Sequence, residues 1–396
     1  LPATYRTRPI CHANHRNLMA RCPSTKDTDG SSRRRGMRRR STMKEQQHGR
    51  AGVTVKVIGV GQGGCSAVDR MISASLRGVD LVAVDTDLQV LDRCQAGAKV
   101  LIGRKETRGL GAGGDWNRGR EAALEGQSQI AEAVEGAAVV FVVAGMGCGT
   151  GTGSAGVIAE VARSSGALTV GVVTRPFRFE GRVRNQTAEA GLSPLRESAD
   201  AVVVVLNDRL SQVVERRTTL QEAFLIVADV LRQGVQGITD LLAGGLKVAD
   251  LQMVMARSGD AVLGIGHSAA EGRAELAARQ AATCPLFGAS IGHARGLVIN
   301  VTAGPDAGPR ERDAAVELVR TEAAPDAAVV SGTVTDPRMR GEMKVTIIAT
   351  GVSSGRPPLQ EPPAPGSEPP DPSGVPARPL PPYPPPATSA AIERTG

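Results

Sequence analysis

The chain has 396 residues, a formal net charge of +7, 48 glycines and only 2% aromatic residues. So few aromatic side chains argue against nucleic-acid modules that stack bases on aromatic platforms. The charge is uneven: residues 1–50 hold 13 Lys and Arg against three acids, whereas the remaining chain holds 34 basic and 37 acidic residues. The basic character therefore belongs to the N-terminal segment, and we expect no nucleic-acid partner.

The cysteines and histidines point to no metal site. The six cysteines form no CxxC pair, and the five histidines show no metal-ligand spacing. This pattern argues against a zinc site and against a secreted disulfide framework. No apolar run approaches the roughly 18–20 residues that span a bilayer, so we expect no direct membrane insertion.

Residues 1–50 are rich in Arg, Ser and Thr and poor in acids. This composition is typical of an organelle transit peptide, and a disordered basic arm is the alternative. At the other end, 15 of the 25 prolines lie between residues 357 and 386. We therefore expect 352–396 to be a disordered, extended spacer, with a partner-docking peptide as the alternative.

Between these ends, short β-branched runs alternate with segments of helical spacing. The predicted strands are 53–60, 79–84, 137–144, 167–173, 201–206, 296–301, 328–334 and 342–349. The predicted helices are 67–76, 121–134, 156–164, 220–242, 269–282 and 311–323. Such alternation indicates βαβ units and a mainly parallel sheet. The fold class is therefore α/β, with a Rossmann-like domain over 51–219, a long core helix over 220–242 and a smaller α+β domain over 243–351.

The first glycine-rich segment follows the first predicted strand. Gly59, Gly61 and Gly64 form a GxGxxG pattern, and Asp85 ends the next strand. This arrangement is the fingerprint of a dinucleotide-binding fold. A nicotinamide-dependent oxidoreductase is therefore one hypothesis, although the motif alone has low specificity.

A second glycine-rich segment, 145–154, follows the apolar strand 137–144 and precedes a helix. Its glycines permit positive φ and close backbone approach, so that several N–H groups can converge on a phosphate. The helix start adds its dipole, and Thr150 and Thr152 add hydroxyl donors. No Gly-Lys-Ser/Thr follows, so this is not a Walker A loop. A dehydrogenase needs only one such loop, and the second one favours a nucleotide phosphate site.

Residues 147–153 resemble the GGGTGTG signature of the tubulin/FtsZ family, in which this loop wraps the nucleotide phosphates. Further segments match FtsZ in order, namely 57–71, 107–114 (TRGLGAGG), 174–181 (TRPFRFEG), 207–210 (NDRL), 223–237 (AFLIVADVLRQGVQG), 300–306 (NVTAGPD) and 345–351 (VTIIATG). The resemblance covers about 53–351. The sequence LRQGVQG and the transit-peptide-like N-terminus resemble chloroplast members most.

The resemblance implies GTP as the ligand, with Mg²⁺ bound together with its phosphates. Asn207, Phe224 and Asp229 would hold the guanine, Phe224 by stacking and Asp229 by accepting from the N–H edge of the base. Glu180 and Arg184 would contact the ribose and the phosphates, and 111–114 would approach the terminal phosphate. With 111–114 included, the implied GTP-binding residues in or beside the glycine-rich segments are Gly61, Gln62, Gly63, Gly64, Ser66, Gly111, Ala112, Gly113, Gly114, Gly147, Cys148, Gly149, Thr150, Gly151, Thr152 and Gly153.

Four residues near this site depart from the family pattern. Ser66 replaces a guanine-contacting Asn, and Asp85 replaces the usual Asn before Thr86. Asp115 adds a carboxylate where the family has Asn, which is unfavourable beside a triphosphate unless a cation intervenes. Cys148 replaces a glycine, and we expect its Cβ to crowd a backbone position that requires positive φ. Together these changes predict altered nucleotide handling.

The largest difference from the family pattern lies in the segment that corresponds to the catalytic loop of the family. In the family, each subunit inserts a loop of the form Gly-Leu-x-Asn-x-Asp-Phe-Ala-Asp into the nucleotide pocket of its neighbour. The corresponding segment 245–250 is about three residues shorter and retains only Asp250 as a catalytic acid. Because hydrolysis depends on positioning, a misplacement of about 1 Å can cost about 100-fold in rate. We expect a slow GTPase.

The resemblance thus implies a filament-forming GTPase of the organelle division ring that self-associates into protofilaments, located in the chloroplast stroma, with the cytoplasm as the alternative. A second hypothesis is a hydrolytically weak structural subunit that copolymerises with a competent FtsZ paralogue. The shortened loop favours copolymerisation with another FtsZ.

Overall fold

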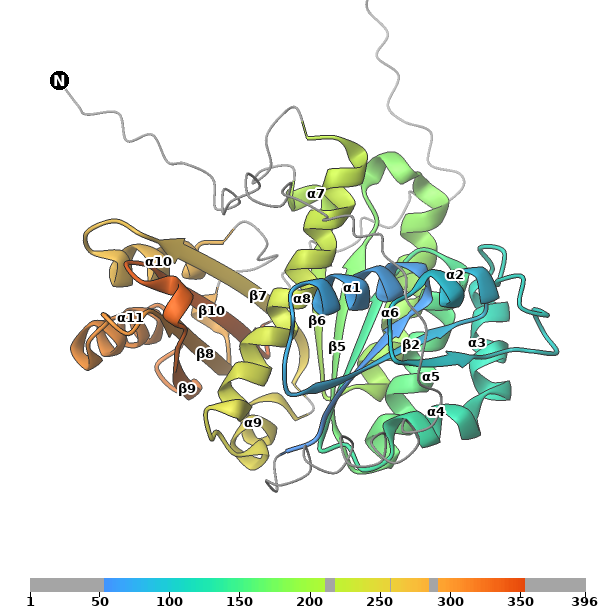
Figure 1. The fold of residues 1–396 in the computed structure, drawn as a ribbon, viewed down its shortest axis with the longest axis horizontal. Coiled ribbons are helices and arrows are strands. Elements are labelled where there is room, and N and C mark those ends of the chain that lie inside the picture. Colours follow the sequence, from blue (N-terminus) through green and yellow to red (C-terminus); the bar gives the residue numbers. More distant parts are fainter. Residues whose placement is uncertain (1–52, 211–217, 257, 285–290, 353–396) are drawn as a thin grey trace, which may run out of the picture. The chain divides into compact units, whose positions relative to one another are not determined.

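The computed structural model describes residues 53–210, 218–256, 258–284 and 291–352. The predictions for residues 1–50, and those for the proline-rich segment beyond residue 352, lie outside these described residues. Within them, strands and helices alternate as the sequence predicts (Figure 1).

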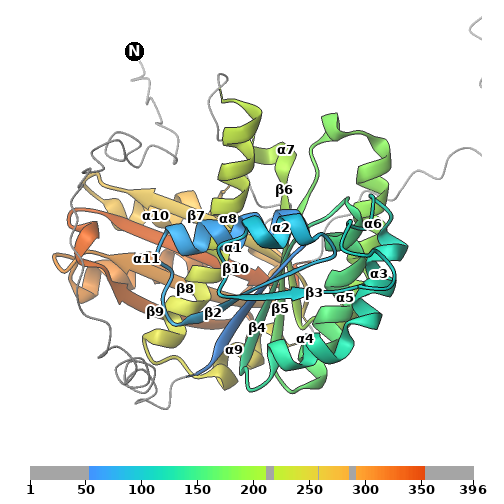
Figure 2. The same cartoon turned by 45° about the vertical axis from the view of Figure 1, so that its right-hand side comes forward.

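Ten strands form a single sheet in the order β3-β2-β1-β4-β5-β6-β7-β10-β8-β9 (Figures 1 and 2). Their bounds are β1 Val55–Val60, β2 Val79–Asp85, β3 Ala98–Leu101, β4 Val139–Gly145, β5 Leu168–Arg175, β6 Ala201–Leu206, β7 Gly259–Ser268, β8 Gly296–Ala303, β9 Ala328–Thr335 and β10 Met343–Thr350. The strands from β3 to β6 are all parallel, and β10 is antiparallel to both of its neighbours.

The helices cover both faces of this sheet. Their bounds are α1 Gly61–Ser73, α2 Leu88–Arg93, α3 Trp116–Glu125, α4 Gln127–Val134, α5 Gly149–Ser164, α6 Arg182–Ser198, α7 Asn207–Leu210, α8 Leu220–Ala243, α9 Val248–Met255, α10 Arg273–Ala282 and α11 Pro309–Thr321. Because both faces are covered, β4 reads VVFVVAG with six of its seven residues buried. Continuous apolar strands of this kind are typical of parallel sheets.

Alternate side chains along the strands pack into two hydrophobic cores, one on each face of the sheet. Val57 and Phe141 face the side covered by α1 and α8, whereas Ile58 and Val142 face the side covered by α3 to α6. The first core continues into the β7–β10 part of the sheet. Helix α8 contacts α1, β5, β8, β9 and β10 and thereby joins both parts.

Several sequence-based element boundaries were wrong. The helix expected over 121–134 is two helices, since Gly126 separates α3 from α4 and a methyl group there would lie 2.6 Å from the Ile102 side chain. Helices α1 and α5 begin at Gly61 and Gly149, because glycines that signal loops here form the first helical turns. Strand β7 and helix α6 were not predicted: β7 contains three glycines, and α6 contains Pro194.

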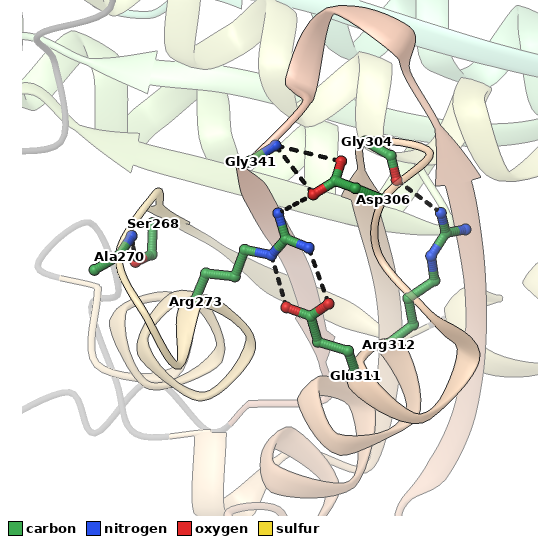
Figure 3. A network of polar contacts seen from close by, with 8 residues as sticks. All are labelled: Ser268, Ala270, Arg273, Gly304, Asp306, Glu311, Arg312 and Gly341. Carbon is green, nitrogen blue, oxygen red and sulfur yellow. Dashed lines mark hydrogen bonds and ion pairs between the residues drawn. The ribbon is translucent and has the colours of Figure 1, made fainter.

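One guanidinium ties together three segments of the C-terminal part (Figure 3). Arg273, in the first turn of α10, makes two hydrogen bonds to the Glu311 carboxylate, at 2.6 and 2.9 Å. It also donates to Asp306 at 2.6 Å, and Asp306 accepts from the backbone N–H of Gly341. The Arg273 side chain is only 12% exposed. This network therefore fixes α10, α11 and the turn before β10 relative to one another.

We expect Arg273→Gln to lower the free energy of unfolding by about 1–3 kcal/mol, because charged hydrogen bonds are lost where the guanidinium is largely buried. Urea unfolding measures this change. Arg338→Gln is the control, since Arg338 is 81% exposed and pairs with Asp336 two residues away. An equal loss in both variants would contradict the special role of Arg273.

The same network predicts a pH dependence. Hydrogen bonds from Arg273 lower the pKa values of both Asp306 and Glu311 below their ordinary range. Ionised carboxylates therefore favour the folded state, and this stabilisation is present above about pH 4–5 and is lost as the pH falls further. Unfolding curves between pH 6 and pH 3 are expected to show a smaller acid-induced loss of stability in Arg273→Gln.

Candidate functional site

Two glycine-rich helix starts meet at the carboxyl edge of the sheet. Strands β1 and β4 are neighbours, so the segments after Val60 and Gly145 emerge side by side. A methyl group on Gly61 would lie 2.8 Å from the Gly151 nitrogen, and Gly61 has φ +70°. A methyl group on Gly63 would lie 3.1 Å from Gly145. The two backbones touch here because neither carries a side chain, and the positive ends of α1 and α5 converge.

The segment 107–114 closes the same region. The Gly111 N–H donates to the Thr86 carbonyl at 3.1 Å, and Leu110 forms a β-bridge with Asp87. A methyl group on Gly149 would lie 2.7 Å from the Ala112 Cβ. All four glycines of this segment have positive φ: Gly109, Gly111, Gly113 and Gly114. The three glycine-rich segments of the predicted site are therefore in contact with one another.

The expectation that Cys148 occupies a positive-φ position was wrong. Cys148 has φ −110° and ψ 175°, an extended conformation that any residue adopts, and it is exposed. The positive φ of this loop lies at Gly147, with φ +101°, where a methyl group would also lie 2.9 Å from the Arg184 carbonyl oxygen. The loop therefore accepts a side chain at 148 but not at 147.

Asp115 has a structural role that the sequence did not indicate. Its carboxylate accepts the Asn117 N–H at 2.9 Å and caps the N-terminus of α3. A carboxylate at this position satisfies one of the free N–H groups of the helix and favours its positive end.

The two threonines of the loop are buried and face protein groups. Thr152 accepts from the Gly147 N–H at 2.8 Å and so holds the shape of the loop. The Thr150 hydroxyl lies 2.6 Å from the Thr86 hydroxyl, at the end of β2. Ser66, the replacement for an Asn, donates to the Gln62 carbonyl of its own helix at 2.9 Å.

Glu180 and Arg184 form a pair near this loop. The Glu180 carboxylate accepts from Arg184 at 2.5 Å and from the Phe177 N–H at 2.9 Å. The hydrogen bond that Arg184 donates to Glu180 raises the pKa of Arg184, which is about half exposed and stays positively charged. The Arg184 carbonyl lies beside Gly147, so Arg184 and its partner Glu180 are near the predicted phosphate loop.

The predicted base-binding residues come from β6, α7 and α8. Asn207 follows β6, is 4% exposed, and its Oδ1 has no hydrogen-bond partner among the described residues. Phe224 is 44% exposed and contacts Phe177 edge-on, with ring centroids 5.8 Å apart. Phe177 also stacks on Phe179. An exposed ring and a buried unpaired amide are features that suit a planar, hydrogen-bonding ligand.

Asp229 has partners that the sequence reasoning missed. Its carboxylate accepts from Arg232 at 2.8 Å, Gln233 at 2.8 Å and Arg70 at 3.2 Å. Burial raises the pKa of Asp229, but the hydrogen bonds and charges of Arg232 and Arg70 outweigh it and bring the pKa below its ordinary value. Asp229 is therefore ionised and acts as an acceptor. The i, i+3 spacing of Asp229 and Arg232 was a visible signal, whereas Arg70 lies 159 residues away.

Asp250 does not lie with the other predicted residues. It is half-buried in the first turn of α9, after the C-terminal end of α8. Helix α8 has 24 residues and at about 1.5 Å per residue is about 36 Å long. Because β7 begins beside the first residue of β6, α9 lies at the opposite end of the strands from α7, the helix that begins with Asn207 (Figure 1). The proposed catalytic acid cannot reach the glycine-rich site of its own chain.

A groove of about 850 Å³ lies elsewhere, along the edge strand β3. Lys56, Asp80, Lys99, Arg104 and Glu132 contribute its charged lining, and none of the predicted GTP-binding residues lines it. Its charge is mixed, so it offers no match to a triphosphate. We therefore place the candidate site at the converging glycine-rich segments.

Comparison with known proteins agrees with this geometry. The GTPase domain of the Tubulin/FtsZ family matches residues 54–215, and the C-terminal domain of the FtsZ family matches residues 259–353. A solved FtsZ dimer from M. jannaschii, described as empty, is 36% identical, with a TM-score of 0.74, covering 79% of this chain and 92% of that chain. The chain belongs to the FtsZ/tubulin family.

Two further structures extend the comparison. A tryptophan-to-tyrosine point mutant of M. jannaschii FtsZ is also 36% identical with a TM-score of 0.74, covering 79% of this chain and 95% of that one. The GTPγS-bound protofilament of CetZ2 from Haloferax volcanii has 23% identity and a TM-score of 0.63, covering 76% and 93%. That lower identity supports the fold alone. The FtsZ/tubulin assignment thus rests on the family models and on the M. jannaschii proteins.

The site fits the GTP that this family implies. The glycine contacts leave no space for Cβ atoms but leave backbone N–H groups at two helix starts, which suits phosphates. The unpaired Asn207 amide oxygen can accept an N–H of a base. Among the described residues, no group of three His, Cys, Asp or Glu could hold a metal ion. When bound, Mg²⁺ would neutralise phosphate charge, and it is commonly held in part by the phosphates themselves. Within the same residues, no helix is long and apolar enough to cross a membrane.

The contrast between positions 147 and 148 gives a test of the loop geometry. We expect Gly147→Ala to lower the free energy of unfolding by about 1–3 kcal/mol, because Ala is strained at φ +101° and meets a carbonyl oxygen. Cys148→Gly removes no strain and is expected to lower stability slightly, by less than about 1 kcal/mol, through the added freedom of glycine. Thermal and urea unfolding measure both. A stabilised Cys148→Gly would show that Cys148 is strained after all.

Proposed function

We propose that this chain binds GTP at the converging glycine-rich segments and self-associates into protofilaments, with hydrolysis at the contact between successive subunits. The observation that carries this proposal is the placement of Asp250 at the opposite end of α8 from Asn207 and the phosphate loops. A carboxylate there can act only on the nucleotide of another subunit. Head-to-tail assembly would bring the two half-sites together.

In this proposal one surface of each subunit binds the nucleotide and the opposite surface supplies the catalytic carboxylate. Backbone N–H groups of α1, α5 and the 107–114 segment would hold the phosphates, and Arg184 would add positive charge. Phe224, Asn207 and Asp229 would fix the base. Asp250 of the adjoining subunit would orient the water that attacks the terminal phosphorus, which releases GDP and phosphate.

We further propose that hydrolysis is slow. Helix α8 ends at Ala243 and α9 begins at Val248, so only residues 244–247 connect them. Gly245 has φ +100°, which closes this short turn. Asp250 is thereby fixed within the first turn of a helix instead of on an extended loop. This short connection also favours the second candidate function, a structural subunit that copolymerises with a catalytically competent FtsZ.

The site of action in this proposal is the plastid division ring, in the chloroplast stroma. The basic, acid-poor residues 1–50 and the wording of 231–237 support it. The cytoplasm is the alternative location.

The first experiment measures GTP turnover and GTP-dependent sedimentation of the full chain, alone and mixed with a competent FtsZ. We expect little turnover alone and co-sedimentation in the mixture, because a competent partner supplies the missing loop. Turnover alone at the rate of the competent protein would contradict the slow-hydrolysis proposal. Failure to bind GTP at all would overturn the proposed function.

A pair of variants separates the two half-sites. Asp250→Asn is expected to lower the remaining turnover at least about tenfold and to leave the affinity for GTP unchanged, since its carboxylate acts on another subunit. Phe224→Ala is expected to weaken GTP binding by about 1–3 kcal/mol through lost stacking on the base. Titration with GTP and single-turnover rates measure both. Loss of affinity in Asp250→Asn would argue against a division of roles between subunits.

A further inference from the structure

Asp85 is a buried carboxyl at the phosphate site, and it ends β2. It is 2% exposed, and its Oδ1 accepts the backbone N–H groups of Thr86 at 2.7 Å and Asp87 at 3.1 Å. Its Oδ2 is buried without a hydrogen-bond partner among the described residues. A buried carboxylate oxygen of this kind is costly unless it gains a proton or a donor.

The surroundings of Asp85 connect it to the phosphate loop. The Thr150 hydroxyl favours the ionised form of Asp85, and the same hydroxyl lies 2.6 Å from the Thr86 hydroxyl. The other titratable groups that act on Asp85 are Asp87, next along the chain, and the Cys65 thiol of α1. No ion pair neutralises Asp85 within the described residues. A triphosphate bound at the start of α5 would add further negative charge.

Burial is the main reason that the pKa of Asp85 is raised to about 6; the backbone N–H groups of Asp87 and Thr86 oppose it, and the charge of Asp87 adds to it. The carboxyl is therefore ionised at neutral pH in the free protein, but close enough to neutral pH for a nearby anion to protonate it. An Asn at this position would carry an amide that donates at every pH.

We infer that Asp85 couples nucleotide binding to protonation: GTP binds together with one proton, which Oδ2 of Asp85 takes from solvent. This inference rests on the proposed GTP site. Two effects act in the same direction. Protonation removes a negative charge beside the phosphates. A protonated Oδ2 is also a donor instead of a buried, unpaired acceptor, and it no longer depends on the Thr150 hydroxyl, which favours the ionised form.

The experiment is calorimetric titration of the full chain with GTP between pH 5.5 and pH 8, in buffers of different protonation enthalpy. At pH 7.5 the chain is expected to take up close to one proton per GTP. The terminal phosphate, with its pKa near 6, is largely ionised at this pH, so GTP itself does not supply that proton. The Asp85→Asn variant is expected to take up no proton on binding GTP. It is expected to bind GTP more tightly than the unchanged chain, by up to about 30-fold at pH 7.5, if the pKa of Asp85 is about 6 in the free protein. The two proteins converge near pH 5.5.

Asp80→Asn is the matched control, because Asp80 lies at the exposed start of the same strand. It is expected to behave as the unchanged chain does. No proton uptake by the chain at pH 7.5, equal pH dependence in chain and Asp85→Asn, or weaker binding by Asp85→Asn at every pH would each overturn the inference while GTP binding stands. Absence of GTP binding by the chain at every pH would overturn the proposed function as well.

Discussion

The contact between two bare backbones at the ends of β1 and β4 is the constraint on which the nucleotide site depends. Parallel pairing puts Val60 beside Ala144, so the chains that leave these strands must turn within a narrow space. Gly61 and Gly151 approach so closely that a single methyl group would not fit between them. Side chains would hold α1 and α5 apart and separate the N–H groups that are needed to converge on one phosphate chain.

Helix α8 sets the second constraint, which is distance. It begins beside the predicted base-binding residues and ends at the short turn before α9, which carries Asp250, and it packs on strands of both parts of the sheet. A helix of this length and burial keeps the two ends apart under all conditions in which the chain is folded. In the proposed function, nucleotide binding and catalytic assistance therefore lie on different surfaces, and hydrolysis would require assembly. The short turn of 244–247 then limits how far the Asp250 carboxylate can extend.

The sequence determined much of this. Its glycine spacing, the apolar strands and the order of the matching segments were sufficient for the fold class and for the convergence of the three glycine-rich segments, because close backbone approach has no other common sequence solution. It also identified α8 and β6 nearly to the residue, since both have strong, uninterrupted patterns. The sequence pattern was too weak to predict β7 and α6. Glycines in β7 allow close packing against α10, and a glycine and a proline in α6 pack closely against α5. Propensity describes a residue, whereas these positions are decided by their neighbours.

Only the tertiary structure decided what each residue that differs from the family pattern does at the site. Position 148 is extended and tolerates a cysteine, because the positive φ of the loop falls on Gly147. Asp115 caps a helix, and Asp229 is held by an arginine from α1 that is distant in sequence. Asp85, one departure among several in the sequence, is the one whose pKa burial raises to about 6. The reason is physical: backbone angles, desolvation and long-range ion pairs arise from the surroundings of a residue, and those surroundings exist only after the chain has folded.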